Sequence, residues 1–175
     1  MTLTKIKKTT GKTPKGLGMP TAKMIHSFFC KIFYDRLSDI TMKETNKLSR
    51  MNLDREAPVY RWGMKGEVKP DMAYFTSIER IEDSIDAAYK DPLFEIEVVD
   101  NHGKKGSYNN IKKVFKEVTS MKEAFLYNYE TKEWTRYTPS KDTEPKSAET
   151  DYSSTFKVHL NTLLTNQPHD RSKNL

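Results

Sequence analysis

Hydrophobic side chains recur every three or four residues in a segment near the N-terminus, from Met24 to Ile40. This spacing places them on one face of an amphipathic helix. Thr41 followed by Glu44 fits a capping box, so a second short helix is predicted from residue 42 to about 50. The pattern therefore indicates a helical lobe at the start of the folded part of the chain.

Farther along, short apolar runs alternate with turn residues. This pattern predicts strands over residues 57–63, 72–77, 94–98, 124–129 and 134–138. Helices are predicted over 78–89, where isoleucines recur at helical spacing, and over 111–118. Residues 101–106 contain glycines and polar residues and are predicted to form a turn.

These elements predict an α+β fold, in which an N-terminal helical lobe precedes a split, mostly antiparallel β core. Residues 1–20 are expected to be a basic flexible arm, and residues 21–138 the folded domain. Residues 139–175 are expected to be a polar linker and C-terminal tail, with a docking element at 155–165.

The net charge of +6 in 175 residues is concentrated in this arm, which holds five lysines and no acidic residue. The remainder of the chain has 25 basic and 24 acidic residues and is almost neutral. A nearly neutral domain argues against a broad nucleic-acid-binding face on it. The arm, by contrast, could contact RNA or a ribosome through residues 5–15.

Several other classes can be set aside. The single cysteine, Cys30, excludes an internal disulfide and a cysteine-cluster zinc site, and its place on the apolar helix face predicts a buried, inert thiol. No apolar run reaches the 18 to 20 residues of a membrane helix, so a soluble, intracellular protein without membrane contact is expected. The four histidines are scattered, without a pair at metal-ligand spacing, and no metal is predicted: His26, His102, His159 and His169.

Three short features could carry chemistry. Arg61, in Tyr60-Arg61-Trp62-Gly63, could direct its guanidinium at a carboxylate or phosphate, although an arginine on the solvent face of a strand is the simpler interpretation. Phe75-Thr76-Ser77 offers hydroxyl groups, although Thr and Ser are also ordinary helix caps. Glu123 stands just before an apolar strand, where a solvated carboxylate is common.

Taken in order, these features resemble the Arg–Ser–Glu class of mono-ADP-ribosyltransferases, which includes the small Mod-type enzymes of T-even bacteriophages. The resemblance covers about residues 22–138. It implies a β core of the ADP-ribosyltransferase type and the transfer of ADP-ribose from NAD to a protein, with an arginine of host transcription or translation proteins as acceptor. NAD would be the substrate, no metal would be needed, and a phage-encoded protein would act in the host cytoplasm.

The resemblance also implies roles for individual residues. Glu123 would stabilise the oxocarbenium-like ribose, Arg61 would bind the pyrophosphate, and Ser77 would order the nicotinamide side. The rest of the NAD site would comprise Trp62, Gly63, Phe75 and Thr76. The sequence departs from the family pattern at Phe75, where a hydroxyl residue is usual, and at Met121, where Glu or Gln is usual.

Two alternatives follow from these departures. A non-catalytic relative could keep the fold and bind RNA or a ribonucleoprotein through the arm, or the motifs could be coincidental in an accessory protein. A different site could use Glu95 or Glu97, which alternate with the hydrophobic residues of the strand at 94–98. Because ordinary alternation explains both glutamates, Glu123 ranks above them as the catalytic carboxylate.

Overall fold

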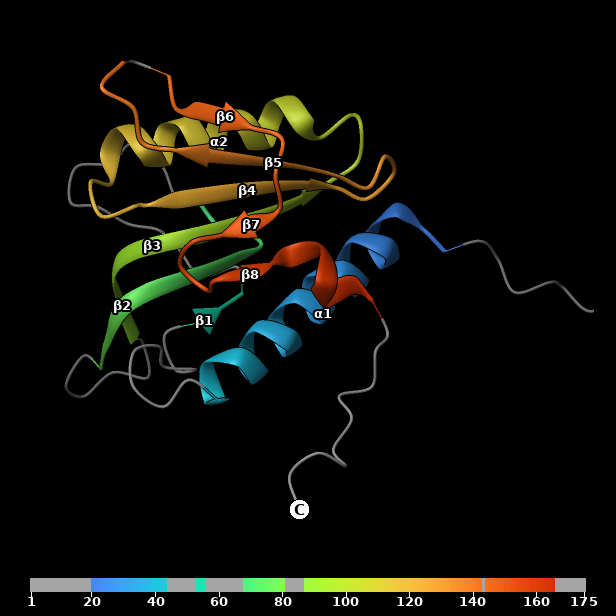
Figure 1. Cartoon of the computed structure of the whole chain (residues 1–175), viewed down its shortest axis with the longest axis horizontal. Helices are drawn as coiled ribbons and strands as arrows, with labels where there is room; N and C mark the ends of the chain where they lie inside the picture. Colours follow the sequence, from blue (N-terminus) through green and yellow to red (C-terminus); the bar gives the residue numbers. More distant parts are fainter. Residues whose placement is uncertain (1–19, 44–52, 56–67, 81–86, 143, 166–175) are drawn as a thin grey trace, which may run out of the picture.

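The structure, a computed structural model, describes residues 20–43, 53–55, 68–80, 87–142 and 144–165. The predicted arm, apart from residue 20, and the strand predicted at 57–63 lie outside the described residues. Of the second helix predicted from residue 42 to about 50, residues 42 and 43 belong to the first helix, which ends at Lys43, and the rest lies outside the described residues. A mixed β-sheet forms the centre of the molecule, with helices packed on both of its faces (Figure 1). The chain is therefore α+β, as predicted.

The sheet has six strands in chain order: β1 (Leu53–Asp54), β2 (Met72–Arg80), β3 (Ala87–Val99), β4 (Glu123–Asn128), β5 (Glu133–Thr138) and β6 (Lys146–Ala148). All neighbouring strands are antiparallel except β3 and β4, which are parallel. A parallel pair needs a crossover connection. Helix α2 (Lys104–Glu117) supplies it, so α2 lies against one face of β3 and β4.

Helix α1 (Ala22–Lys43) covers the opposite face of the sheet. Its buried residues Cys30, Phe33 and Leu37 follow helical spacing and pack against alternate residues of β3 and β4. Phe33 meets Tyr127 and Trp134 edge to face, with ring centroids 5.5 and 5.2 Å apart. Burying each of these large side chains contributes about 1.5 to 3 kcal/mol, which holds α1 on the sheet.

The C-terminal part of the described chain lies on the same face as α1. It contains β7 (Tyr152–Ser153), β8 (Val158–His159) and the 3-10 helix η2 (Leu160–Leu164). Phe156, Leu160 and Leu163 are buried in the cluster that contains the α1 residues. Within the segment expected to be a linker, β6 pairs with β5, and the segment expected to dock holds β8 and η2.

Two local predictions are wrong. Residues 78–80 belong to β2 and residues 87–89 to β3, where Ile78 pairs with Tyr89, although a helix was predicted for both segments. Cross-strand hydrogen bonds outweigh a short helical periodicity here. The turn predicted over 101–106 ends at Gly103, and α2 begins at Lys104, earlier than the helix predicted from residue 111.

Other elements agree with the sequence pattern. The strands predicted at 72–77, 94–98, 124–129 and 134–138 correspond to β2, β3, β4 and β5. The helix predicted at residues 24–40 corresponds to α1. Among the residues that the structure describes, no helix combines the length and apolar character needed to cross a membrane.

Candidate functional site

Two glutamates of β3 are buried between the sheet and α2. Phe94, Ile96 and Val98 belong to the core on the α1 side, so the alternate residues Glu95 and Glu97 face the other way. Only 1% of Glu95 and 6% of Glu97 is exposed. The alternation with apolar residues suggested that these glutamates would face solvent. They do not, because β3 is an interior strand that is covered on both faces.

The carboxylate groups of these residues lack the partners that buried charges normally have. Within the described part of the chain, neither oxygen of Glu95 has a hydrogen-bond partner, and Oε1 of Glu97 has none. Oε2 of Glu97 accepts a hydrogen bond from Ser107 Oγ of α2 at 3.1 Å. A buried, unpaired carboxylate costs several kcal/mol and is usually neutralised by a proton or a cation.

Burial raises the pKa of Glu95 to about 8. The pKa of Glu97 rises to about 9, first through burial and then through the negative charges of Glu95 and Asp71, against a lowering hydrogen bond from Ser107. Among the residues that the structure describes, no basic side chain contributes to either shift. The two groups therefore hold protons at neutral pH unless a cation replaces them.

Asp71 adds a third carboxylate at the start of β2. Because Met72 pairs with Ile96, the residue before it lies beside Glu97. Asp71 Oδ2 accepts a hydrogen bond from the backbone N–H of Val98 at 2.7 Å. Since 16% of its side chain is exposed, Asp71 is the carboxylate of these three that reaches the surface, at the start of β2.

We name Asp71, Glu95 and Glu97 the acidic cluster. Carboxylate oxygens are hard ligands, which suit Mg²⁺ and Mn²⁺. The unpaired buried oxygens of Glu95 and Glu97 are what such a site requires, because a bound cation would neutralise and coordinate them. The chemistry of these oxygens therefore suits a divalent cation, although the three carboxylates are not among the described groups whose ligand atoms already lie within 4.8 Å of one another, so binding would require their side chains to move.

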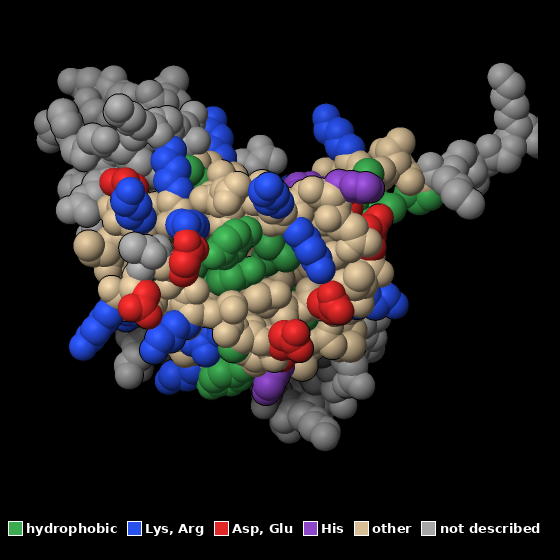
Figure 2. All heavy atoms as spheres, turned by 90° about the horizontal axis from the view of Figure 1, so that it is seen from above, with side chains coloured by type: hydrophobic (Ala, Val, Ile, Leu, Met, Phe, Trp, Pro, Cys, Tyr) green, Lys and Arg blue, Asp and Glu red, His purple; other side chains and the backbone are tan. Residues whose placement is uncertain are grey.

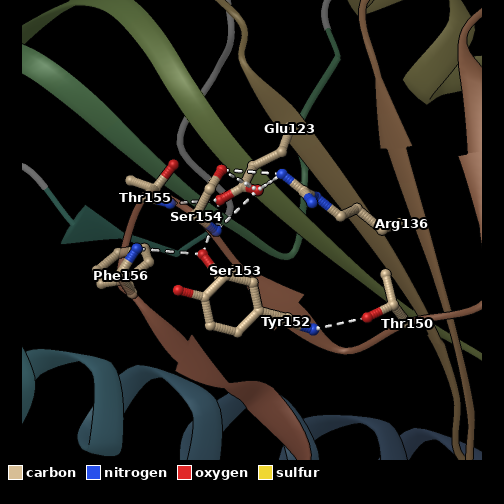
Figure 3. A network of polar contacts seen from close by, with 8 residues as sticks. All are labelled: Glu123, Arg136, Thr150, Tyr152, Ser153, Ser154, Thr155 and Phe156. Atoms are coloured by element: carbon tan, nitrogen blue, oxygen red, sulfur yellow. Dashed lines mark hydrogen bonds and ion pairs between the residues drawn. The ribbon is translucent and has the colours of Figure 1, made fainter.

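Glu123, the carboxylate favoured by the sequence, lies in a different environment on the α1 face, where it pairs with Phe94 in the sheet (Figure 3). It is completely buried, and its oxygens accept hydrogen bonds from Ser153 Oγ at 2.7 Å and Thr155 N at 2.8 Å. Ser154 donates from both its backbone N–H and its hydroxyl group. Arg136 Nη2 of β5 lies 2.7 Å from Glu123 Oε2.

These partners stabilise the ionised form of Glu123. Burial by itself would raise its pKa, but the hydrogen bonds from Ser153, Thr155 and Ser154 outweigh burial and lower the pKa. Both carboxylate oxygens are used in joining β4 to the segment at 153–155. The contacts therefore describe a structural clamp that leaves no oxygen directed at a ligand.

The structure describes only some of the other predicted site residues. Arg61, Trp62 and Gly63 lie outside the described residues. Thr76 and Ser77 lie within β2 and not at a helix start. Phe75 is fully buried in the cluster on the α2 face, together with Met121. Phe75 and Glu123 therefore lie on opposite faces of the sheet.

A surface depression of about 480 Å³ lies near the turn between β4 and β5. It is lined by Lys104, Lys132, Glu133, Trp134, Thr135, Glu149, Thr150, Asp151 and Asn161. Two of its carboxylates are engaged, since Lys104 lies 3.4 Å from Glu133 and His159 lies 2.8 Å from Asp151. These pairs account for Lys104, Glu133 and Asp151 without a ligand, and no carboxylate of this depression is buried and unpaired as those of Glu95 and Glu97 are, so the acidic cluster remains the stronger candidate.

No protein-family model matches the sequence, and no curated protein matches it. Among solved structures, the chain is similar to the 1.96 Å crystal structure of a protein from Anabaena variabilis ATCC 29413, described as "a putative nuclease belonging to DUF820". The match has a TM-score of 0.54 and 16% sequence identity, and it covers 83% of this chain and 82% of the other. This likeness shows a common fold.

The comparison contradicts the resemblance to ADP-ribosyltransferases. The similar structure belongs to a different class of protein, and the described strands form a mixed sheet with a parallel β3–β4 pair. ADP-ribose transfer is therefore wrong as the function, and the keywords derived from it are wrong too. The RNA-binding alternative gains no support, and the expectation of NAD as a substrate loses its basis.

Proposed function

We propose that this protein is a nuclease that hydrolyses phosphodiester bonds at the acidic cluster with the help of a divalent cation. The observation that carries the proposal is the pair of buried carboxylates, Glu95 and Glu97, without cationic partners in the described structure. Keeping unpaired acidic groups in a core is costly, and a functional site is the usual reason for accepting that cost. The fold likeness to a protein described as a nuclease suggests the reaction class.

Asp71, Glu95 and Glu97 would hold the cation, since Glu95 and Glu97 face α2 and Asp71 lies beside Glu97 on the neighbouring strand, with one oxygen near His26 of α1. Two contacts orient them: Ser107 Oγ donates to Glu97, and the Val98 N–H donates to Asp71. A bound divalent cation supplies Lewis-acid stabilisation of phosphate charge and a more acidic water.

Helix α2 provides the basic surface that a polyanionic substrate needs. It carries five lysines and a single glutamate between residues 104 and 117. Lys105 and Lys116 are exposed, and the same helix supplies Ser107 to the acidic cluster. On the face seen in Figure 2, Lys and Arg side chains, with acidic side chains among them, lie around a small hydrophobic area. Phosphate contacts from α2 would therefore bring the backbone of a nucleic acid close to the carboxylates.

Cleavage assays test the proposal directly. Labelled single- and double-stranded DNA and RNA are incubated with the purified full chain in Mg²⁺, in Mn²⁺ or in EDTA. We expect cation-dependent cleavage of at least one of these substrates, and its loss in Glu97→Gln. Glu149→Gln, which changes an exposed glutamate directly after β6, serves as the matched control and is expected to keep full activity.

Two outcomes would overturn the proposal. One is the absence of cleavage of every substrate in either cation. The other is equal cleavage by wild type and by a folded Glu97→Gln variant, because activity that survives this change does not come from the acidic cluster.

A further inference from the structure

A second group of metal-ligand side chains lies where α1 meets the start of β2. His26 and Cys30 are four residues apart on α1 and therefore lie on one face of the helix. The third member is Asp71, which precedes β2. One ligand atom from each of the three residues lies within 4.8 Å of the other two.

We propose that His26, Cys30 and Asp71 form a binding site for a thiophilic divalent transition metal such as Zn²⁺, separate in its ligand chemistry from the cation of the acidic cluster. His26 Nε2 lies 3.0 Å from Asp71 Oδ1 and 3.8 Å from Cys30 Sγ. Nitrogen, oxygen and sulfur ligands of a tetrahedral Zn²⁺ ion lie about 3.3 to 3.6 Å from one another, given the usual bond lengths. Small adjustments of the side chains would therefore suffice for coordination.

The ligand set itself selects the metal. A thiolate and an imidazole suit Zn²⁺ and Co²⁺, whereas Mg²⁺ prefers an environment of oxygen atoms only. Three protein ligands leave a fourth position for water. His26 retains 33% exposure of its side chain, which gives an ion a route from solvent, while Cys30 is 3% exposed and shielded from oxidation.

Asp71 connects this site to the acidic cluster. Its Oδ1 atom faces His26, whereas its Oδ2 atom accepts the hydrogen bond from Val98 beside Glu97. A metal bound by the three residues would tie α1 to the start of β2 and fix the orientation of Asp71. The binding of the metal does not rest on the proposed nuclease function, although it would affect one of the cluster carboxylates.

Cobalt is a suitable probe because a Co²⁺–thiolate bond gives charge-transfer absorption in the near ultraviolet. The chain contains one cysteine, so such a band identifies Cys30 as a ligand without ambiguity. We expect the metal-free full chain to develop this band with one equivalent of Co²⁺, and added Zn²⁺ to displace it. Zn²⁺ is also expected to raise the unfolding temperature of the protein.

Three single variants separate the site from incidental binding. Cys30→Ser is expected to lose the band, and His26→Gln, which changes a partly exposed residue, to bind Co²⁺ at least about tenfold more weakly. His159→Gln is the matched control, because His159 also contacts a carboxylate, Asp151 at 2.8 Å, but has no thiol beside it in the described structure. This variant is expected to bind Co²⁺ as wild type does.

The proposal is overturned if no thiolate band appears and Zn²⁺ leaves the unfolding temperature unchanged, since His26 and Asp71 are then only an ion pair beside a buried thiol. It is also overturned if His26→Gln and His159→Gln bind Co²⁺ equally well. Glu97→Gln keeps the two proposals distinguishable, because it removes a ligand of the acidic cluster and none of this site. A thiolate band that persists in an inactive Glu97→Gln variant supports both proposals, and a band without nuclease activity in wild type supports this site alone.

Discussion

Burial does not distinguish Glu95 and Glu97 from Glu123, but their hydrogen-bond partners do. Glu123 is fully buried with four hydrogen bonds and an arginine, whereas Glu95 is equally buried with no partner for either oxygen in the described residues. The first arrangement stabilises a fold, and the second leaves a cost that a ligand can remove. At the residue scale this contrast moves the candidate site from Glu123 to Glu95, Glu97 and Asp71.

The first prediction follows from this cost. Glu95→Gln and Glu97→Gln keep the side-chain volume but cannot ionise. Each should therefore reduce the rate of cation-dependent cleavage by at least about 100-fold. Each should also raise the free energy of unfolding at pH 8 by about 1 to 3 kcal/mol, because a buried charge is no longer required. Urea unfolding of the metal-free proteins measures this change, and variants that are both active and less stable would contradict the assignment.

The raised pKa values of Glu95 and Glu97, about 8 and 9, set the pH dependence of the metal-free protein. In the unfolded chain both groups ionise near their ordinary pKa of 4.5, so between that pH and about 9 the folded state binds more protons. Stability therefore falls as pH rises through this window. Urea midpoints between pH 5 and 9 should decline in wild type and decline less in the double Gln variant. Parallel declines would contradict the raised pKa values.

At the scale of elements, Glu123 clamps the end of the described chain to the sheet. It joins β4 to residues 153–155, and Phe156 next to this clamp packs 4.8 Å from Phe94, measured between ring centroids. Glu123→Ala would leave Arg136 without its carboxylate and should lower the free energy of unfolding by about 2 to 4 kcal/mol. Denaturant unfolding measures this loss, and a stable Glu123→Ala protein would show that the clamp is dispensable.

The clamp also has a pH signature opposite to that of the acidic cluster. Because the pKa of Glu123 is lowered in the folded state, its contribution to stability is present above the ordinary value of 4.5 and is lost as pH falls through the lowered value. Glu123→Gln should therefore lose less stability than wild type between pH 5 and 3. It should retain nuclease activity at neutral pH, and its inactivity in a folded state would return Glu123 to the list of catalytic candidates.

Helix α2 covers the acidic cluster with its inner face and carries lysines on its outer face, where a nucleic acid could bind. Replacing the exposed Lys105 and Lys116 with Gln should weaken nucleic-acid binding and reduce the slope of log K against log[salt] by up to about 2. Lys31→Gln on α1, which pairs with Asp35 on the far side of the sheet, is the control. Fluorescence anisotropy at several salt concentrations measures both quantities, and an equal effect in the control would rule out α2 as the contact surface.

At the scale of the whole molecule, hydrophobic periodicity predicted α1, the strands of the second half and the α+β class. These elements have long or regular patterns, such as the alternating Phe94, Ile96 and Val98 and the helical spacing of Phe33 and Leu37. The strand pairing near Ile78 was not predictable from local spacing, because it depends on a partner strand around Tyr89. The family resemblance failed because short motifs such as Phe75-Thr76-Ser77 carry no information about which face of a sheet they occupy.

The candidate site was within reach of the sequence but was ranked second. Glu95 and Glu97 alternate with apolar residues, which usually indicates a solvated face. A helix following directly after this strand, starting at Lys104, predicts a crossover that covers the second face and buries both glutamates. The basic surface of α2 was also not predicted. The net charge of residues 21–175 is nearly neutral, and a net charge over so many residues does not show that five lysines lie on one helix.

Locating the cation in a crystal shows whether the acidic cluster binds metal. Crystals of the full chain are soaked in Mn²⁺, which favours oxygen ligands, and anomalous scattering identifies the metal position. We expect a Mn²⁺ ion within coordination distance of carboxylate oxygens of Glu97 and Asp71, with Glu95 adjacent, and no such ion in Glu97→Gln crystals. A wild-type protein that cleaves nucleic acid in Mn²⁺ while its ion binds elsewhere, or that leaves the acidic cluster without metal at saturating Mn²⁺, would contradict this expectation.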